Sequence, residues 1–88
     1  MGVDVKIKNK ILILVYVPII DQEYNAFIPI GKTIGTVKSV IMDTVSELTE
    51  QKFINEMILI NKLTGEVYDD DILVKNTQIE NGTKLLLI

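Results

Sequence analysis

The sequence predicts an α+β fold in which one amphipathic helix packs on a mixed β-sheet. Three observations predict it. β-rich apolar segments lie toward both ends of the chain, apolar residues recur every three or four positions in the middle, and turn residues separate these patterns. The chain has 88 residues, of which 48% are hydrophobic. This length and composition suit a single domain covering residues 1–88 with a well-filled core.

Two strands are expected first, and they are expected to pair as a hairpin. The segment Ile11–Val17, "ILILVYV", is apolar and rich in β-branched residues. The segment Glu23–Ile30 follows after a break at Pro18–Gln22, and this spacing suits a connection of four or five residues. Pro29 is expected near the end of an edge strand, where a missing N–H group breaks no ladder bond.

A helix is expected next, with Thr33 as its N-cap. Val40 and Met42 flank its apolar stripe and are expected in the periphery of the core, and Lys38 is expected away from the stripe. The stripe itself has the spacing of a single helix face. Its members are Ile34, Val37, Ile41, Val45 and Leu48.

The segment just before the helix, "AFIPIGKT", comes within one residue of a phosphate-binding loop. Gly31, Lys32 and Thr33 match the pattern G-x-x-x-x-G-K-[ST], but its first glycine is missing. The four residues between the two glycine positions read as a strand, whereas a phosphate loop needs flexible backbone there. We therefore expect a strand-to-helix turn and no nucleotide site.

The last third of the chain returns to strands. Met57–Asn61, "MILIN", is expected as a strand, and the turn "KLTG" leads to a short strand at Glu66–Tyr68. An irregular crossover, "DDDILVKNTQI", follows with one short helical turn. Its expected anchors in the core are Ile72, Leu73 and Ile79.

The chain then turns once more into a final strand. Asn81-Gly82 is a strong turn signal, and "TKLLLI" follows it. The resulting order is β-β-α-β-β-β, which is the β-grasp arrangement. Closing this sheet places the last strand beside the first, and these two most apolar segments are expected at its centre.

Several classes of function are not expected from this composition. The chain has no cysteine and no histidine, so thiolate chemistry, a histidine base and zinc sites of the usual kind are not expected. The net charge is −3, and Lys6, Lys8 and Lys10 form the only basic cluster, so no nucleic-acid partner is expected. The run Tyr68–Asp71, "YDDD", has no calcium-loop spacing and is interpreted as a solvated acidic turn, with no metal site.

The apolar segment near the start is not expected to enter a membrane. Lysines precede it, as in a secretory leader, but Asp4 and Pro18 interrupt the pattern and "DQEY" is not a cleavage site. The segment is also shorter than the roughly 20 residues that span a bilayer. We expect a cytoplasmic protein without direct membrane insertion.

The order of elements and the ending "ILVKNTQIENGTKLLLI" resemble ubiquitin-like proteins. The similarity is greatest to the YukD/EsaB family of type VII secretion accessory proteins in Gram-positive bacteria, and it covers about Val3 to Ile88. Its most specific part is a series of positions near the end. These are Leu73, Ile79, Asn81, Gly82, Leu85 and Leu87.

The resemblance implies a small protein that binds other proteins and has no catalytic activity or cofactor. Its partners would be the secretion machinery or its regulators. Ubiquitin itself acts through a flexible Gly-Gly tail, whereas this sequence ends in Leu86-Leu87-Ile88, so conjugation is not expected. The alternative function is a small β-grasp structural subunit of another multiprotein complex.

The candidate binding surface is the side of the sheet that faces away from the helix. Alternation along the first strand directs Ile13 and Val15 toward the helix, together with Val5 and Ile7 further upstream. The residues expected on the other side form an apolar patch large enough to be a contact surface for a protein partner or for a second copy in a homodimer. They are Leu12, Leu14, Tyr16, Met57, Leu59 and Leu86.

Overall fold

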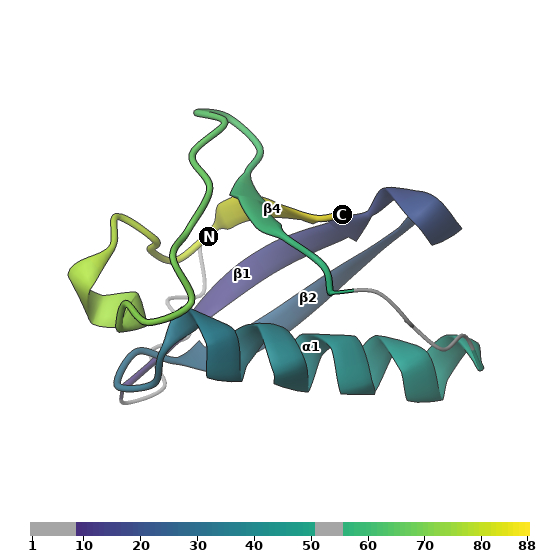
Figure 1. Ribbon diagram of the computed structural model, residues 1–88, viewed down its shortest axis with the longest axis horizontal. Coiled ribbons are helices and arrows are strands. Elements are labelled where there is room, and N and C mark those ends of the chain that lie inside the picture. Colours follow the sequence, from purple (N-terminus) through teal and green to yellow (C-terminus); the bar gives the residue numbers. More distant parts are fainter. Residues whose placement is uncertain (1–8, 51–55) are drawn as a thin grey trace, which may run out of the picture.

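The computed structural model describes residues 9–50 and 56–88, and in these ranges a four-stranded sheet packs against one helix (Figure 1). The spatial order of the strands is β2-β1-β4-β3. β1 pairs with β2 antiparallel and with β4 parallel, and β3 pairs with β4 antiparallel. The strands are β1 (Lys10–Val17), β2 (Gln22–Pro29), β3 (Leu59–Asn61) and β4 (Thr83–Leu87).

The first two strands form the predicted hairpin. A short 3₁₀ turn, η1 (Pro18–Ile20), connects them, and Asp21 closes the turn in the left-handed region with a φ of 50°. The Tyr16 hydroxyl donates a hydrogen bond to the Asp21 carboxylate across the same turn. Both strands begin one residue before their predicted starts, so the alternation of apolar residues located them well.

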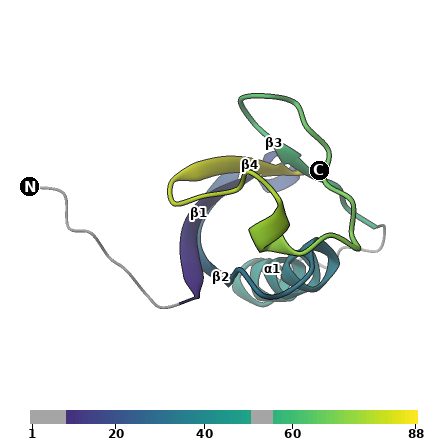
Figure 2. The ribbon, with the colours of Figure 1, turned by 90° about the vertical axis from the view of Figure 1, so that its left-hand side faces the viewer.

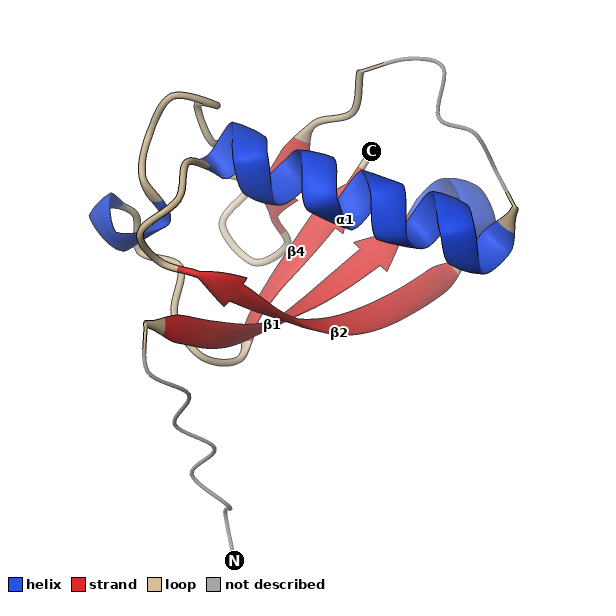
Figure 3. Cartoon of the chain, turned by 90° about the horizontal axis from the view of Figure 1, so that it is seen from below, coloured by secondary structure: helices blue, strands red, loops and turns tan. Residues whose placement is uncertain are grey.

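Helix α1 (Ile34–Thr49) crosses one face of the sheet (Figure 3). Thr33 is its N-cap, as predicted, and its Oγ1 accepts a hydrogen bond of 3.2 Å from the Thr36 N–H. Gly31, Lys32 and Thr33 form the turn between β2 and α1, so the near-match to a phosphate loop lies partly in a strand and partly in a helix cap. Among the described residues, no helix is long and apolar enough to cross a membrane.

The apolar stripe of α1 is buried over most of its length, with three departures from prediction. The predicted residues Ile34, Val37, Ile41 and Val45 are at most 6% exposed. Leu48, in the last turn, is 66% exposed, and Val40 is 60% exposed. Both were predicted to contribute to the core or its periphery, and both predictions are wrong. Met42 packs partly buried against the core, as predicted. Lys38, expected away from the stripe, is nevertheless buried, with 7% of its surface exposed.

The burial of Lys38 follows from an ion pair that no local pattern indicates. Its Nζ lies 2.9 Å from Asp70 Oδ1 and 3.5 Å from Glu56 Oε1. The backbone approaches closely at the same place, because the Gly35 N–H donates to the Asp70 carbonyl at 3.0 Å. A Cβ atom on Gly35 would lie 3.2 Å from Asp70 Cβ. The loop that contains Asp70 is therefore fastened to the first turns of α1.

This ion pair predicts a loss of stability at alkaline pH. Burial lowers the pKa of Lys38, but the hydrogen bond and charge of Asp70, with Glu56, outweigh burial and raise the pKa above its ordinary value. Since the charged form is favoured in the folded state, the stabilisation is complete below the ordinary lysine pKa of about 10.4 and is lost as the pH rises through the folded-state value. Urea unfolding between about pH 9 and 12 measures this loss.

Other lysines and the tyrosines also titrate in that range, so a matched variant is needed. Lys38→Met removes the titrating group while keeping an apolar side chain of similar length. We expect the free energy of unfolding of Lys38→Met to fall less steeply with pH than that of the parent protein. Parallel curves for the two proteins would contradict a folded-state pKa raised by the ion pair.

The crossover before the last strand contains the predicted helical turn, η2 (Val74–Asn76). Its main anchor is Val74, which is fully buried, and Ile79 is 7% exposed, as predicted. Ile72 is 40% exposed, so its prediction as an anchor is wrong, and Leu73 is half-buried and bridges to Thr33. The crossover is therefore anchored in the core mainly by Val74, within the helical turn, and not by Ile72 before it.

The predicted strand at Glu66–Tyr68 is reduced to a single bridge. Val67 pairs with Ile60 in an isolated antiparallel bridge, and Val67 is 59% exposed. Two hydrogen bonds hold the returning chain to β3, from the Asn61 N–H to the Glu66 carbonyl at 2.9 Å and from the Tyr68 N–H to the Leu59 carbonyl at 3.3 Å. The sheet thus has one strand fewer than predicted in the described part of the chain.

The last strand lies beside the first, as predicted, and the Asn81-Gly82 turn positions it. Gly82 has a φ of +87°, which glycine adopts without strain. Asn81 Oδ1 accepts a 2.8 Å hydrogen bond from the Leu12 N–H, and the Gly82 N–H donates to the Leu12 carbonyl at 2.8 Å. These bonds extend the β1–β4 ladder by one step.

The core lies between the sheet and α1. Its centre consists of fully buried side chains from the two central strands, which alternate along each strand as the sequence predicted. Val5 and Ile7, expected to continue this row, lie outside the described residues. The fully buried members on the two strands are Ile13, Val15, Val17, Leu85 and Leu87.

Candidate protein-binding surface

The side of the sheet opposite α1 carries apolar side chains at regular intervals. Figure 2 shows α1 on one side of the sheet, and none of the helices described in residues 9–50 and 56–88 lies on the other. Leu12, Leu14 and Tyr16 alternate with the buried residues of β1 and therefore point to this second side. All three are half-buried.

The strand register joins these side chains into rows. Tyr16 is paired with Leu86 of β4, and Leu86 is paired with Ile60 of β3, so an apolar row crosses three strands. Leu12 is paired with Phe27 of β2, whose side chain is 41% exposed. Both rows lie on the same face because paired residues point to the same side of a sheet.

One further apolar pair continues the pairing of β3 with β4 by one residue past the start of β3 and the end of β4. Ile58 and Ile88 exchange two backbone hydrogen bonds, of 2.6 and 3.0 Å, and their side chains are 46% and 49% exposed. Together with the rows above they form what we call the open-face patch. It consists of Leu12, Leu14, Tyr16, Phe27, Ile58, Ile60, Leu86 and Ile88.

Two of the six predicted surface residues do not reach this patch. Met57 is 7% exposed and Leu59 is 1% exposed, and both belong to the core. The side chains of Met57–Ile60 therefore alternate with the opposite parity to that predicted, and Ile58 and Ile60 point outward instead. The register explains this, since Leu59 is paired with the fully buried Leu87.

Charged groups stand around the middle of the patch. The Lys62 ammonium lies 5.6 Å from the centre of the Tyr16 ring, close enough for a cation–π contact. The hydrogen bond to Asp21, with some burial and the charge of that carboxylate, raises the pKa of the Tyr16 hydroxyl. The Tyr16 side chain thus has a hydrogen-bond partner at its hydroxyl and a cation near its ring. Glu23 and Lys84 are paired with Tyr16 and Leu14, respectively, and add one charge of each sign.

The acidic run at Tyr68–Asp71 has structural contacts. The Tyr68 side chain is buried, and its hydroxyl accepts a 3.1 Å hydrogen bond from Asn61 Nδ2. Asp69 Oδ1 accepts from the Asp71 N–H at 3.2 Å and so closes the turn, while Asp70 binds Lys38. The side chains of Tyr68, Asp69 and Asp70 therefore hold this loop in place.

No family model matches the sequence, and no curated protein matches it. Solved structures match the fold well. One, described as "Molecular Mimicry of SUMO promotes DNA repair", has a TM-score of 0.69 at 15% identity and covers 96% of each chain. The ubiquitin-like domain of an Arabidopsis thaliana protein has a TM-score of 0.67 at 16% identity, covering 100% of this chain and 85% of that one.

A ubiquitin from Caldiarchaeum subterraneum has a TM-score of 0.67 at 16% identity, covering 90% of this chain and 91% of that one. Similarity at this level of identity establishes the fold and leaves function to be argued from the surface. The order of elements, the mixed sheet and the similar solved structures all indicate the same fold. This chain has the α+β, β-grasp fold of ubiquitin-like proteins.

Proposed function

We propose that this protein is a non-catalytic interaction module that binds another protein through the open-face patch. The observation that supports this most is the continuity of the patch across all four strands. Most surface apolar residues on a monomer are scattered, whereas contiguous patches tend to be contact sites. The patch also has the composition of an interface centre, with an aromatic ring among aliphatic side chains and charges beside them.

The finer proposal is that the partner belongs to a Gram-positive type VII secretion system, in which this protein would act as an accessory or regulatory factor in the cytoplasm. Its support is the resemblance of the sequence ending to the YukD/EsaB family. A neighbouring gene for an FtsK/SpoIIIE-type ATPase, together with genes for small WXG-motif substrates, would strengthen it. Neighbouring genes for a multicomponent enzyme would favour a structural subunit instead.

Replacing Leu14 with aspartate tests the role of the patch. Leu14 is half-buried at the centre of the open face, so the charge can remain hydrated when the protein is free. We expect the free energy of unfolding to fall by about 1 kcal/mol or less. A partner would bury the charge, which is costly, so binding should be lost. Thermal melts by circular dichroism and capture of partners from the host's lysate measure the two effects.

Ser39→Asp is the matched control, since Ser39 is exposed on α1 and far from the open face. It adds the same charge and should change neither measurement. Sedimentation of the parent protein and of Leu14→Asp shows whether the partner is a second copy. If Leu14→Asp keeps every association of the parent protein, the open-face patch is not the binding site.

A further inference from the structure

Asn81-Gly82 is the one place in the sequence where glycine follows asparagine, and both residues are exposed to solvent. Asparagine is a chemically labile residue, and its side-chain amide is lost most readily before glycine. A glycine has no Cβ to shield its backbone nitrogen, and its backbone turns freely. This pair is therefore the position at which a spontaneous chemical change of the chain is expected first.

The reaction at such a pair is a loss of ammonia followed by an uptake of water. The Gly82 nitrogen loses its proton and bonds to Asn81 Cγ, while the bond from Cγ to Nδ2 breaks and ammonia leaves with a proton. Water then opens the five-membered imide at one of its two carbonyl carbons. Attack at Cγ gives aspartate, and attack at the main-chain carbonyl carbon gives isoaspartate, in which the chain runs through the former side chain.

Both reacting groups are held by the same residue of β1. The Gly82 N–H donates to the Leu12 carbonyl at 2.8 Å, and Asn81 Oδ1 accepts from the Leu12 N–H at 2.8 Å. Removing the proton from the Gly82 nitrogen breaks the first bond, and turning Asn81 Cγ toward that nitrogen breaks the second. The nucleophile and the amide that it attacks are therefore both restrained while the turn lies against β1.

The conformation of the turn also opposes ring closure. The Thr83 N–H donates to the Glu80 carbonyl at 3.0 Å, and the Glu80 N–H donates to Thr83 Oγ1 at 2.9 Å. The central residues are Asn81 and Gly82, and only Gly82 has a positive φ, of +87°. This is the pattern of a type II turn, whose first central residue has a ψ of about +120°. The imide ring requires a negative ψ at that residue, so the turn must open before the ring can close.

We propose that Asn81 is a site of spontaneous deamidation whose rate is limited by the opening of the Glu80–Thr83 turn away from β1. The fold slows the reaction, and each opening of the turn gives the pair a chance to react. Deamidation is not reversed by closing of the turn. The fraction of converted chains therefore records how often the junction of β1 and β4 has opened during the lifetime of the protein.

The two products should affect this junction differently. Aspartate keeps the length of the backbone, and its carboxylate can accept the Leu12 N–H as the amide oxygen does. Isoaspartate adds one carbon to the main chain and moves the free carboxylate, so the pairing that continues from Ile13 and Thr83 is displaced. We expect the aspartyl form to keep the first step of the β1–β4 ladder and the isoaspartyl form to lose it.

The test compares three samples in a mildly alkaline buffer. They are the full chain, the full chain unfolded in urea, and a synthetic peptide with the sequence of residues 79–84. Mass spectrometry of proteolytic fragments measures the conversion at Asn81. The folded chain should convert at least about tenfold more slowly than the peptide, and the unfolded chain within about twofold of it. Asn81→Asp supplies the aspartyl product as a reference and should show no conversion at this position.

A matched pair of variants tests the role of the turn. Thr83→Val keeps a β-branched side chain but removes the oxygen that accepts from the Glu80 N–H, so the folded chain should convert at least about threefold faster. Thr44→Val makes the same change on α1, where the hydroxyl donates to the Val40 carbonyl at 2.9 Å, and should convert as the parent protein does. Urea unfolding of both variants shows how much of any increase comes from global unfolding.

Four results would overturn the proposal. One is a folded chain that converts as fast as the peptide, and another is conversion that occurs mainly at other asparagines. A third is a Thr83→Val rate that equals that of the parent protein or follows global unfolding alone. The fourth is an isoaspartyl form in which the Leu12 amide hydrogen exchanges as slowly as it does in Asn81→Asp.

Discussion

Replacing Ile41 with aspartate should abolish cooperative folding. Ile41 lies in the middle of α1, is 6% exposed and belongs to the core between helix and sheet. The variant loses the burial of a large apolar side chain and must bury a carboxylate, while Lys38, one turn earlier on α1, is already paired with Asp70. We expect a cost of about 4 kcal/mol or more, comparable with the whole free energy of unfolding of a domain this small.

Circular dichroism melts and urea titrations measure this effect, and Ser39→Asp is the control. The control adds a carboxylate to the same helix at an exposed position and should change the free energy of unfolding by about 0.5 kcal/mol or less. A cooperative transition of Ile41→Asp at the midpoint of the parent protein would show that α1 does not pack on the sheet through this side chain.

The second large effect is expected at the ion pair between the crossover loop and α1. Asp70→Ala leaves the Lys38 ammonium buried, with only the more distant and largely exposed Glu56 as a partner. Removing one member of a buried pair costs more than the pair contributes. Because the Asp70 side chain is itself 44% exposed, we expect a moderate loss of about 1–2 kcal/mol in the free energy of unfolding.

Lys38→Met should be much less harmful, within about 1 kcal/mol of the parent protein, because an apolar side chain of similar size fills the same space. Adding Lys38→Met to Asp70→Ala should recover part of the stability that Asp70→Ala loses. Urea unfolding of all four proteins completes the cycle. Independent, additive effects of the two substitutions would refute the coupling that the 2.9 Å contact implies.

The strands and the helix were predicted where the local pattern is unambiguous. β1 and β2 have clear limits at Pro18 and Pro29, and α1 has a capping threonine followed by a regular stripe. The turn at Gly82 also follows from its residues, since its backbone lies in the region that glycine favours. Each of these features depends on residues within a few positions of one another.

The errors share the opposite property, because they depend on contacts between distant residues. In "MILIN" four apolar residues follow one another, so no alternation fixes which of them face the core, and the pairing of Leu59 with Leu87 decides it. Lys38 is buried because of Asp70, which lies 32 positions later in the sequence. Such partners become visible only when the chain has folded.

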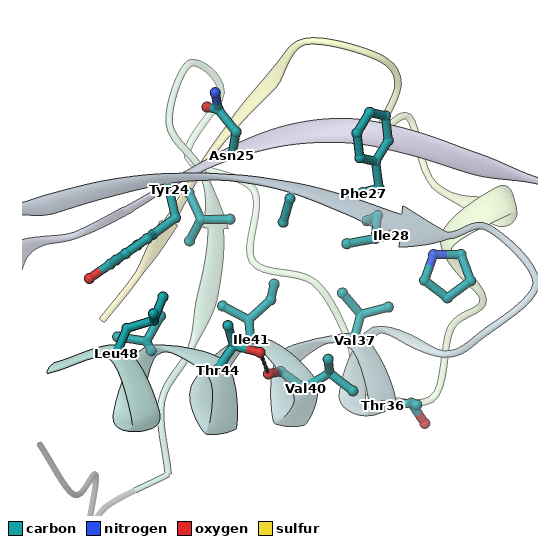
Figure 4. A pocket seen from close by; sticks show the side chains of 14 residues that line it. Tyr24, Asn25, Phe27, Ile28, Thr36, Val37, Val40, Ile41, Thr44 and Leu48 are labelled. Carbon is teal, nitrogen blue, oxygen red and sulfur yellow. Dashed lines mark hydrogen bonds between the residues drawn. The ribbon is translucent and has the colours of Figure 1, made fainter. Parts of the chain in front are cut away.

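The candidate surfaces also include one part that the local pattern predicted and one part that it did not. Leu12, Leu14, Tyr16 and Leu86 were placed on the open side of the sheet by alternation alone, and the structure has them half-buried there. An apolar groove of about 230 Å³ between β2 and α1, lined by Val40, Thr44 and Leu48 (Figure 4), was not predicted, because Val40 was expected in the periphery of the core. The edge position of β2 was predicted from Pro29 and from the pairing of the last strand with the first, and the strand order β2-β1-β4-β3 confirms it.

The parallel pairing of β1 with β4 also determines when this protein can fold during its synthesis. A hydrogen bond joins Leu12 to Asn81, 69 positions apart, and the register continues from Ile13 and Thr83. Contacts between such distant positions form slowly, because a long loop must close before they contribute. While the ribosome still holds the residues of β4, one long side of β1 is unpaired and Ile13 and Val15 lack neighbours that bury them. The chain should therefore complete its core only after β4 has emerged, and until then the unpaired edge of β1 is its most aggregation-prone segment.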